Sequence, residues 1–235
     1  MLFDGLADAV MLVELDEDVA AVWQAILSED APTLIDRIAS FQVSRESVRA
    51  VLEECPTSLL DRAFATLLRN RVQRGGILAP GASLMKNGEN GRGVASRWYP
   101  KTLENRIRDI AAKRMCISFM RGDGIEFMRR NADRTDAVFF VDPPYTVAGR
   151  RLYTHSDIDH QDLFEVASTL RGDFLMTYDA AAPIRALARR FGFDVHEVPM
   201  KNTHHRVMHE LLIGRDLRWA RAQPGHLGQY SLFKL

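Results

Sequence analysis

An apolar run that stops at two consecutive prolines constrains the fold of this chain more than any other feature. Residues 137–141 read Ala-Val-Phe-Phe-Val, and Asp142, Pro143, Pro144 and Tyr145 follow them. Proline has no amide hydrogen to donate to a neighbouring strand, so a strand formed by the apolar run has to stop before the prolines. The pattern predicts a buried strand with a polar loop at its carboxyl end.

Further strands and helices alternate along the chain. Residues 9–15 form another apolar run, which predicts a strand buried on both faces, and Asp16 is the expected N-cap of the helix after it. Additional strands are expected at 115–120, 174–178, 195–200 and 210–214, and helices at 101–113, 160–170 and 183–190. This alternation implies an α/β protein with a doubly wound sheet, in which ligands bind beyond the carboxyl ends of the strands.

Composition fits a folded protein and excludes several functional classes. The chain has 235 residues, 46% of them hydrophobic, which is enough for a substantial core. Its 31 basic and 31 acidic residues cancel, so any site for a polyanion has to be local. Two cysteines cannot form a disulfide scaffold, and no apolar run is long enough to cross a membrane. A cytoplasmic protein without a membrane partner is therefore expected.

The Asp-Pro-Pro-Tyr loop has the chemistry needed to activate an amine. The lone pair of an adenine amino group is delocalised into the ring, so an enzyme has to localise it with hydrogen-bond acceptors. The Asp142 carboxylate and the Pro143 carbonyl can each accept one amino hydrogen, and the prolines keep the backbone rigid. Tyr145 can stack on a base extruded from the duplex. The alternative is a strand that ends in a proline turn and a buried tyrosine.

This motif resembles the catalytic motif of the DNA adenine methylase family, whose members transfer a methyl group from S-adenosylmethionine to the exocyclic amine of adenine. The resemblance implies a Rossmann-like methyltransferase fold in which a helical target-recognition insert interrupts the catalytic domain. Here the catalytic domain would comprise residues 1–30 and 112–235, and the insert residues 31–111. Double-stranded DNA is the implied partner, and a cognate restriction endonuclease would complete a restriction-modification pair.

Four acidic residues resemble cofactor-binding positions of the family or border the same ligand. Glu14, in Val-Glu-Leu-Asp, corresponds best to a carboxylate that holds the ribose hydroxyls of S-adenosylmethionine, with Asp16 close by. Asp123, in Arg-Gly-Asp-Gly, corresponds to a residue near the cofactor adenine, and Asp142 would border the same ligand. The alternatives are a solvated acid for Glu14, a helix cap for Asp16 and a turn residue for Asp123.

Basic residues gather locally despite the neutral total. The stretch from Lys86 to Arg134 contains twelve Lys or Arg residues and six acids. Long cations beside a glycine-rich loop can reach phosphates and base edges, although a solvated basic face is the alternative. The family also has an Asn-Arg stretch in this lobe. The residues predicted to contact DNA are Asn70, Arg71, Arg74, Lys86, Arg92 and Arg97.

The histidines near the C-terminus predict no metal site. His205 and His209 would share one face of a helix, but residues 211–213 are Leu-Leu-Ile and favour a strand. We therefore expect His204, His205, His209 and Glu210 to belong to a hairpin beside the active site.

The glycine-rich first motif of the family has no counterpart in this chain. In the family its strand lies between the strands that here end at Glu14 and Asp142, so both would lack one neighbour. We expect the chain alone to bind S-adenosylmethionine weakly or not at all, which calorimetry tests. A truncated, catalytically silent DNA-binding remnant is one alternative function, and methylation of RNA or of cytosine is another.

Overall fold

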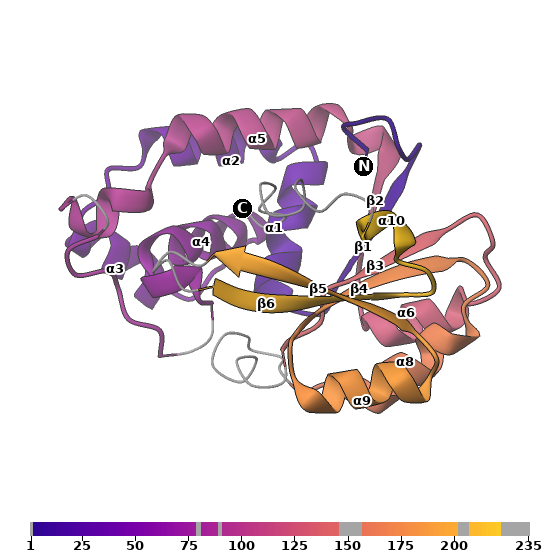
Figure 1. Cartoon of the computed structure of the whole chain (residues 1–235). Helices are drawn as coiled ribbons and strands as arrows, with labels where there is room; N and C mark the ends of the chain where they lie inside the picture. The colour runs from indigo at the N-terminus through magenta and orange to yellow at the C-terminus, as the bar shows by residue number, and fades with distance from the viewer. Residues whose placement is uncertain (1, 79–80, 89–90, 146–156, 202–206, 222–235) are drawn as a thin grey trace. The chain divides into compact units, whose positions relative to one another are not determined.

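The computed structural model describes residues 2–78, 81–88, 91–145, 157–201 and 207–221 (Figure 1). Its described part is α/β, as expected, and its backbone forms two compact units divided at Gly124. Unit 1 runs from the N-terminus to Gly124, and unit 2 begins at Ile125. This division differs from the domain boundaries predicted above because β1 and β2 group with the helices that follow β1.

In its described residues, unit 1 combines a two-stranded parallel sheet with five α-helices. β1 (Val10–Glu14) pairs with β2 (Ile117–Arg121), and Glu14 lies opposite Arg121. The other elements, in chain order, are α1 (Glu17–Leu27), α2 (Ala31–Ser40), α3 (Arg45–Glu53), α4 (Leu59–Val72), η1 (Arg74–Gly76), η2 (Gly93–Arg97), α5 (Pro100–Ala112) and η3 (Arg114–Cys116). α1 packs on α4, and α2 runs beside α5 (Figure 1).

Local sequence explains where several of these helices begin. The Asp16 carboxylate accepts hydrogen bonds from the backbone N–H groups of Asp18 at 2.8 Å and Val19 at 3.2 Å, so Asp16 is the N-cap of α1, as predicted. Ser44 and Ser58 cap α3 and α4 in the same way, and proline occupies the first turn of α2 and of α5.

Aromatic residues occupy the core of unit 1. Phe64 is fully buried, and its ring centroid lies 5.2 Å from that of Phe41 and 6.3 Å from that of Trp98, in edge-to-face geometry. Trp98 is 6% exposed whereas Tyr99 is 48% exposed, so of this pair only the tryptophan contributes to the core.

Unit 2 contains a four-stranded mixed sheet in the order β3-β4-β6-β5. β3 (Val138–Val141) and β4 (Asp173–Asp179) are parallel, whereas β6 (Val207–Gly214) is antiparallel to both β4 and β5 (Asp194–Lys201). α6 (Gly124–Arg130), α8 (His160–Thr169) and α9 (Ala182–Arg190) lie on one face of this sheet, and α10 (Arg218–Arg221) lies on the other (Figure 1).

The predicted burial of β1 and β3 is wrong. Met11 on β1 is 47% exposed, and Val138 and Phe140 on β3 are 62% and 49% exposed. Within the described residues each of these strands pairs on one side only, and Val138 and Phe140 belong to neither hydrophobic cluster of unit 2. A sequence pattern reports which residues are apolar, whereas their burial depends on the elements that pack over them.

Within the described parts of the chain, every helix falls short of the length and apolarity that a bilayer crossing demands.

Candidate functional site

Asp142 lies at the carboxyl end of β3, where the prolines stop the strand. β3 and β4 are parallel and Val141 lies opposite Met176, so Asp142 comes level with Thr177. The Thr177 hydroxyl donates a hydrogen bond to Asp142 Oδ1 at 2.6 Å. Thr177 is fully buried in the middle of the sheet, and its hydroxyl therefore fixes one oxygen of the predicted catalytic carboxylate.

The surroundings of Asp142 favour its protonated form while leaving it accessible. The residue retains an exposed surface, so a ligand can reach it. The protein atoms packed around its carboxyl group raise its pKa by desolvation, and the hydrogen bond from Thr177 opposes this shift. A carboxylate that is partly desolvated and also oriented is typical of functional sites.

Tyr145 is held by an acid from another strand. Its hydroxyl donates a hydrogen bond to Glu210 Oε1 at 3.0 Å. Because β6 is antiparallel to β4, Glu210 near the start of β6 lies opposite Asp179 at the end of β4. Burial raises the pKa of Glu210, the Tyr145 hydrogen bond lowers it, and the charge of Asp142 raises it again. The carboxyl groups of Asp142 and Glu210 are therefore neighbours at this edge of the sheet.

A second hydrogen-bonded pair lies at the same end of β4. His160 Nδ1 is 3.0 Å from the hydroxyl of Tyr178, whose side chain is fully buried. Burial raises the pKa of Tyr178, as does the charge of Asp179. Burial also lowers the pKa of His160, against the opposing charges of Asp179 and Asp159. A neutral imidazole and a neutral phenol therefore extend the polar edge toward α8.

Three of the four acids predicted to bind the cofactor lie at one edge of the β1–β2 pair in unit 1, whereas Asp142 belongs to unit 2. Glu14 is the last residue of β1, and its Oε1 accepts a hydrogen bond from the backbone N–H of Asp16 at 2.8 Å. Asp123 follows β2 and is exposed. Since β1 and β2 are parallel with Glu14 opposite Arg121, Glu14 and Asp123 lie at the same carboxyl edge. Asp16 caps α1 at this edge, and a role in ligand binding stays a prediction.

The predicted DNA-binding residues of unit 1 surround the end of α4. Asn70 Nδ2 donates a hydrogen bond to the carbonyl of Gly76 at 3.0 Å, and Gly76 has a φ of 72°. A side chain at that glycine would lie 3.1 Å from Asn70 Nδ2 and 3.5 Å from the Arg97 guanidinium, which places Asn70 and Arg97 around one tight turn.

Arginine residues come close to one another at this turn. Arg71 is partly buried, and its pKa is lowered first by desolvation and then by the charges of Arg97 and Arg106. Phosphate oxygens are suitable ligands for a group of neighbouring arginine side chains. Arg106, from the exposed face of α5, was not predicted from the sequence. The other predicted residues, Arg74, Lys86 and Arg92, are exposed.

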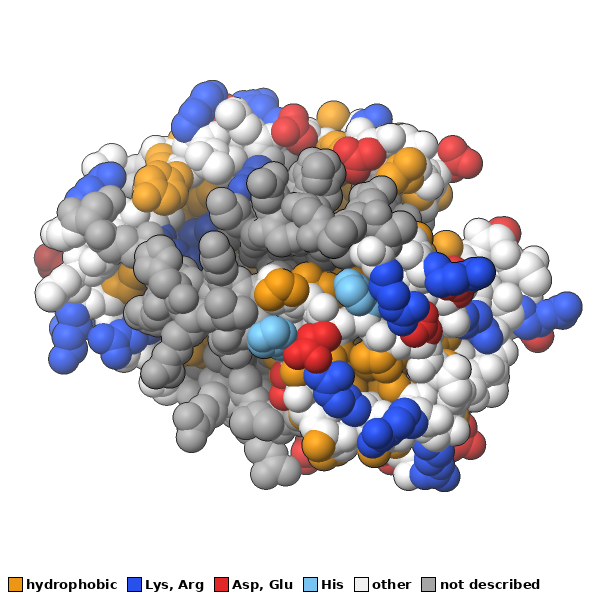
Figure 2. All heavy atoms as spheres, viewed as in Figure 1, with side chains coloured by type: hydrophobic (Ala, Val, Ile, Leu, Met, Phe, Trp, Pro, Cys, Tyr) orange, Lys and Arg blue, Asp and Glu red, His pale blue; other side chains and the backbone are white. Residues whose placement is uncertain are grey.

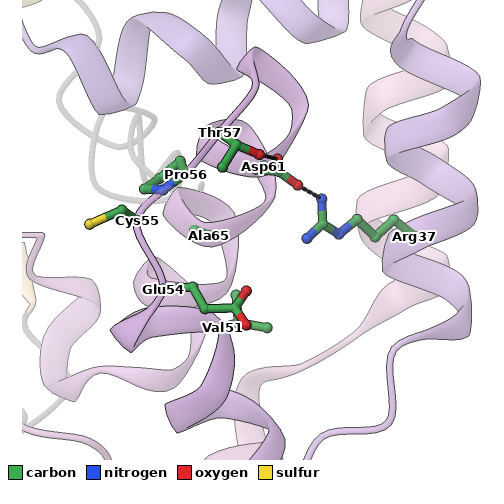
Figure 3. Close-up of a pocket in the computed structure, with 8 residues that line it drawn as sticks. All are labelled: Arg37, Val51, Glu54, Cys55, Pro56, Thr57, Asp61 and Ala65. Carbon is green, nitrogen blue, oxygen red and sulfur yellow. Dashed lines mark hydrogen bonds and ion pairs between the residues drawn. The ribbon is translucent and has the colours of Figure 1, made fainter.

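A surface pocket in unit 1 is lined by none of these residues (Figure 3). Asp61 projects toward Arg37, and their ion pair measures 2.7 Å. Hydrogen bonds from Ser58, Arg37 and Thr57 lower the pKa of Asp61. Because Asp61 is already neutralised by these donors and no predicted site residue lines the pocket, we assign it a structural role in joining α2 to α4.

The structure describes one of the three histidines that were predicted to lie in a hairpin beside the active site. His204 and His205 lie outside the described residues. His209 is exposed, and its Nδ1 lies 2.9 Å from Glu197 Oε1. The other oxygen of the Glu197 carboxylate pairs with Arg185. Figure 2 shows basic, acidic and histidine side chains together over the strands of unit 2. Across the described ranges, no group of three His, Cys, Asp or Glu side chains could hold a metal ion.

Two residues that hydrogen-bond to the Asp142–Tyr145 loop were not predicted from the sequence. Thr177 is the polar residue near the carboxyl end of an apolar strand next to β3, which is a weak signal that becomes informative only once the strand order is known. Glu210 was considered only with the histidines, and nothing local links it to Tyr145.

Comparison of this sequence with known protein families and with characterised proteins finds no match. The function therefore has to be argued from the geometry of these residues.

Proposed function

We propose that this protein transfers a methyl group from S-adenosylmethionine to the exocyclic amine of adenine in double-stranded DNA. The observation that carries the proposal is the Asp142-Pro143-Pro144-Tyr145 loop at the carboxyl end of β3, with its acid accessible and oriented by Thr177. The α/β class and the parallel pairs β1–β2 and β3–β4 support a Rossmann-like methyltransferase fold.

In the proposed mechanism Asp142 and Pro143 act on the target amine. The Asp142 carboxylate accepts one amino hydrogen and the Pro143 carbonyl accepts the other, which directs the nitrogen lone pair toward the incoming methyl group. Thr177 keeps the carboxylate in one orientation during this contact. Tyr145 stacks on the extruded base and offsets part of the unstacking free energy.

Residues of the β1–β2 edge fit the cofactor. When bound, S-adenosylmethionine supplies an electrophilic methyl group on a positively charged sulfur. The Glu14 carboxylate, which accepts from the Asp16 amide, would accept from the two vicinal ribose hydroxyls. Asp123, exposed at the same edge, would accept from the amino group of the cofactor adenine.

Affinity for DNA is assigned to the arginines around the end of α4. Arg71, Arg97 and Arg106 form a local positive cluster in a chain of zero net charge. Such a cluster binds phosphates by releasing counterions, which makes binding depend steeply on salt concentration.

Incorporation of a labelled methyl group from S-adenosylmethionine into DNA tests the proposal, and digestion of the product to nucleosides identifies the acceptor. Because the chain is expected to bind S-adenosylmethionine weakly, the assay uses the cofactor at high concentration, and we then expect N6-methyladenine with the wild-type protein and none with Asp142→Ala. Asp173→Asn is the matched control, because Asp173 is exposed at the opposite end of β4. Binding of DNA without any transfer would instead identify a catalytically silent DNA-binding protein, and methylated cytosine or RNA would reassign the acceptor.

A further inference from the structure

Glu210 contacts the proposed catalytic loop from two strands away. In the order β3-β4-β6-β5, β4 separates it from β3, yet the Tyr145 hydroxyl donates to Glu210 Oε1 at 3.0 Å. The antiparallel direction of β6 makes this possible, because the beginning of β6 lies beside the carboxyl end of β4. The contact therefore ties the loop after β3 to the rigid body of the sheet.

The hydrogen bond to Glu210 restricts the rotation of the Tyr145 ring. Pro143 and Pro144 restrict the backbone before it, but they leave the χ1 and χ2 rotations of the tyrosine free. Residues 142–145 form no helix or strand. A hydrogen bond at the para position selects one ring direction among the available rotamers, and a carboxylate acceptor makes that bond stronger than a neutral one would be.

The surroundings of Glu210 disfavour its charged form. Burial and the neighbouring charge of Asp142 both oppose its ionisation. Within the described part of the chain no cation forms an ion pair with Glu210, and its side-chain hydrogen bond is the one from Tyr145. An acid retained beside another acid, with a phenol as its partner, is better explained by function than by stability.

We propose that Glu210 is a positioning residue for methyl transfer, which holds the ring of Tyr145 in the orientation that stacks on the extruded adenine. This inference rests on the function proposed above. Glu210 acts through Tyr145 and does not itself contact the base. Its loss should therefore slow transfer from bound DNA and leave DNA affinity, which depends on phosphate contacts, nearly unchanged.

Single-turnover methyl transfer at saturating DNA, together with DNA-binding titrations, tests the inference. We expect Glu210→Ala and Tyr145→Phe each to lower the transfer rate about tenfold, with DNA dissociation constants within about twofold of wild type. Glu210→Gln keeps an acceptor oxygen and should recover most of the rate. The double variant Glu210→Ala with Tyr145→Phe should be no slower than either single variant, because all three remove the same hydrogen bond.

Glu197→Ala is the matched control, since this acid lies on neighbouring β5 and pairs with His209 and Arg185 instead. Thermal unfolding of each variant shows whether it is folded. If Glu210→Ala does not fold, Tyr145→Phe still tests the hydrogen bond, because it removes only one hydroxyl group. Independent, multiplying losses in the double variant, or an unchanged rate in Tyr145→Phe, would overturn the inference while the proposed function stands. A wild-type protein that transfers no methyl group would overturn both.

Discussion

Replacing Thr177 with valine should separate the orientation of Asp142 from the stability of the sheet. The Thr177 side chain is fully buried, and its hydroxyl lies 2.6 Å from Asp142 Oδ1. Valine has nearly the same shape and suits a central strand, so the substitution removes little except this donor. Asp142 has an exposed surface, and water can replace the lost hydrogen bond.

The size of the effect follows from the kind of hydrogen bond. A bond to a charged acceptor contributes about 1.5–3 kcal/mol, and each 1.4 kcal/mol corresponds to a tenfold change in rate. If that free energy orients the carboxylate, Thr177→Val should transfer methyl groups roughly 10- to 100-fold more slowly. Because water and the added methyl group compensate in the folded protein, the free energy of unfolding should change by less than about 1 kcal/mol.

The substitution should also change the pH dependence of the reaction. The Thr177 hydrogen bond lowers a pKa that desolvation raises, so its loss should raise the Asp142 pKa further. Transfer requires the ionised carboxylate, and the acidic limb of the pH–rate profile should therefore move to higher pH in Thr177→Val.

Single-turnover transfer across a pH series measures the rate and the acidic limb together, and thermal unfolding measures stability. Thr177→Ser retains the donor and should stay within about threefold of the wild-type rate. A valine variant that is as fast as wild type, with the same acidic limb, would show that the hydroxyl does not orient the catalytic acid.

Three further predictions concern the fold and the DNA surface. Phe64→Ala should destabilise unit 1 by about 3–5 kcal/mol in urea unfolding followed by circular dichroism. Leu59→Ala, at an exposed position, should destabilise it by less than about 1 kcal/mol, and equal losses would contradict the assigned core. Gly172→Ala would place a Cβ 2.3 Å from the backbone oxygen of Ala137, so the free energy of unfolding of unit 2 should fall by about 1–3 kcal/mol. An unchanged melting temperature would refute this close approach. Arg97→Ala should reduce the slope of log affinity for DNA against log salt by about one in fluorescence anisotropy, and an unaltered slope would remove Arg97 from the phosphate contacts.

Features that depend on neighbouring residues in the chain were predictable from the sequence. The N-cap at Asp16 and the stop of β3 at Asp142 follow from a side chain within hydrogen-bonding reach of its own helix and from the backbone chemistry of proline. The alternation of helices and strands likewise gave the α/β class.

Features that depend on strand order were not predictable. Phe140 was expected in a core, yet it is half-exposed, and no hydrophobic cluster among the described residues of its unit includes it. The partners of the proposed catalytic loop come from residues 177 and 210, and only the order β3-β4-β6, with β6 reversed, brings them to it. No local pattern encodes that order, since it is set by the packing of the whole sheet.

The pairing of β5 with β6 has a consequence for how this protein tolerates change. Eight successive residue pairs hold β6 against β5, and neighbouring residues of β6 point to opposite faces, with Glu210 toward Tyr145 and His209 toward Glu197. Extra residues between the two strands would leave this alignment intact. Deleting one residue between Glu210 and Gly214 would offset the preceding part of β6 by one position and present an imidazole to the tyrosine in place of the acid. Natural variants of this protein should therefore differ in length between these strands and rarely within them.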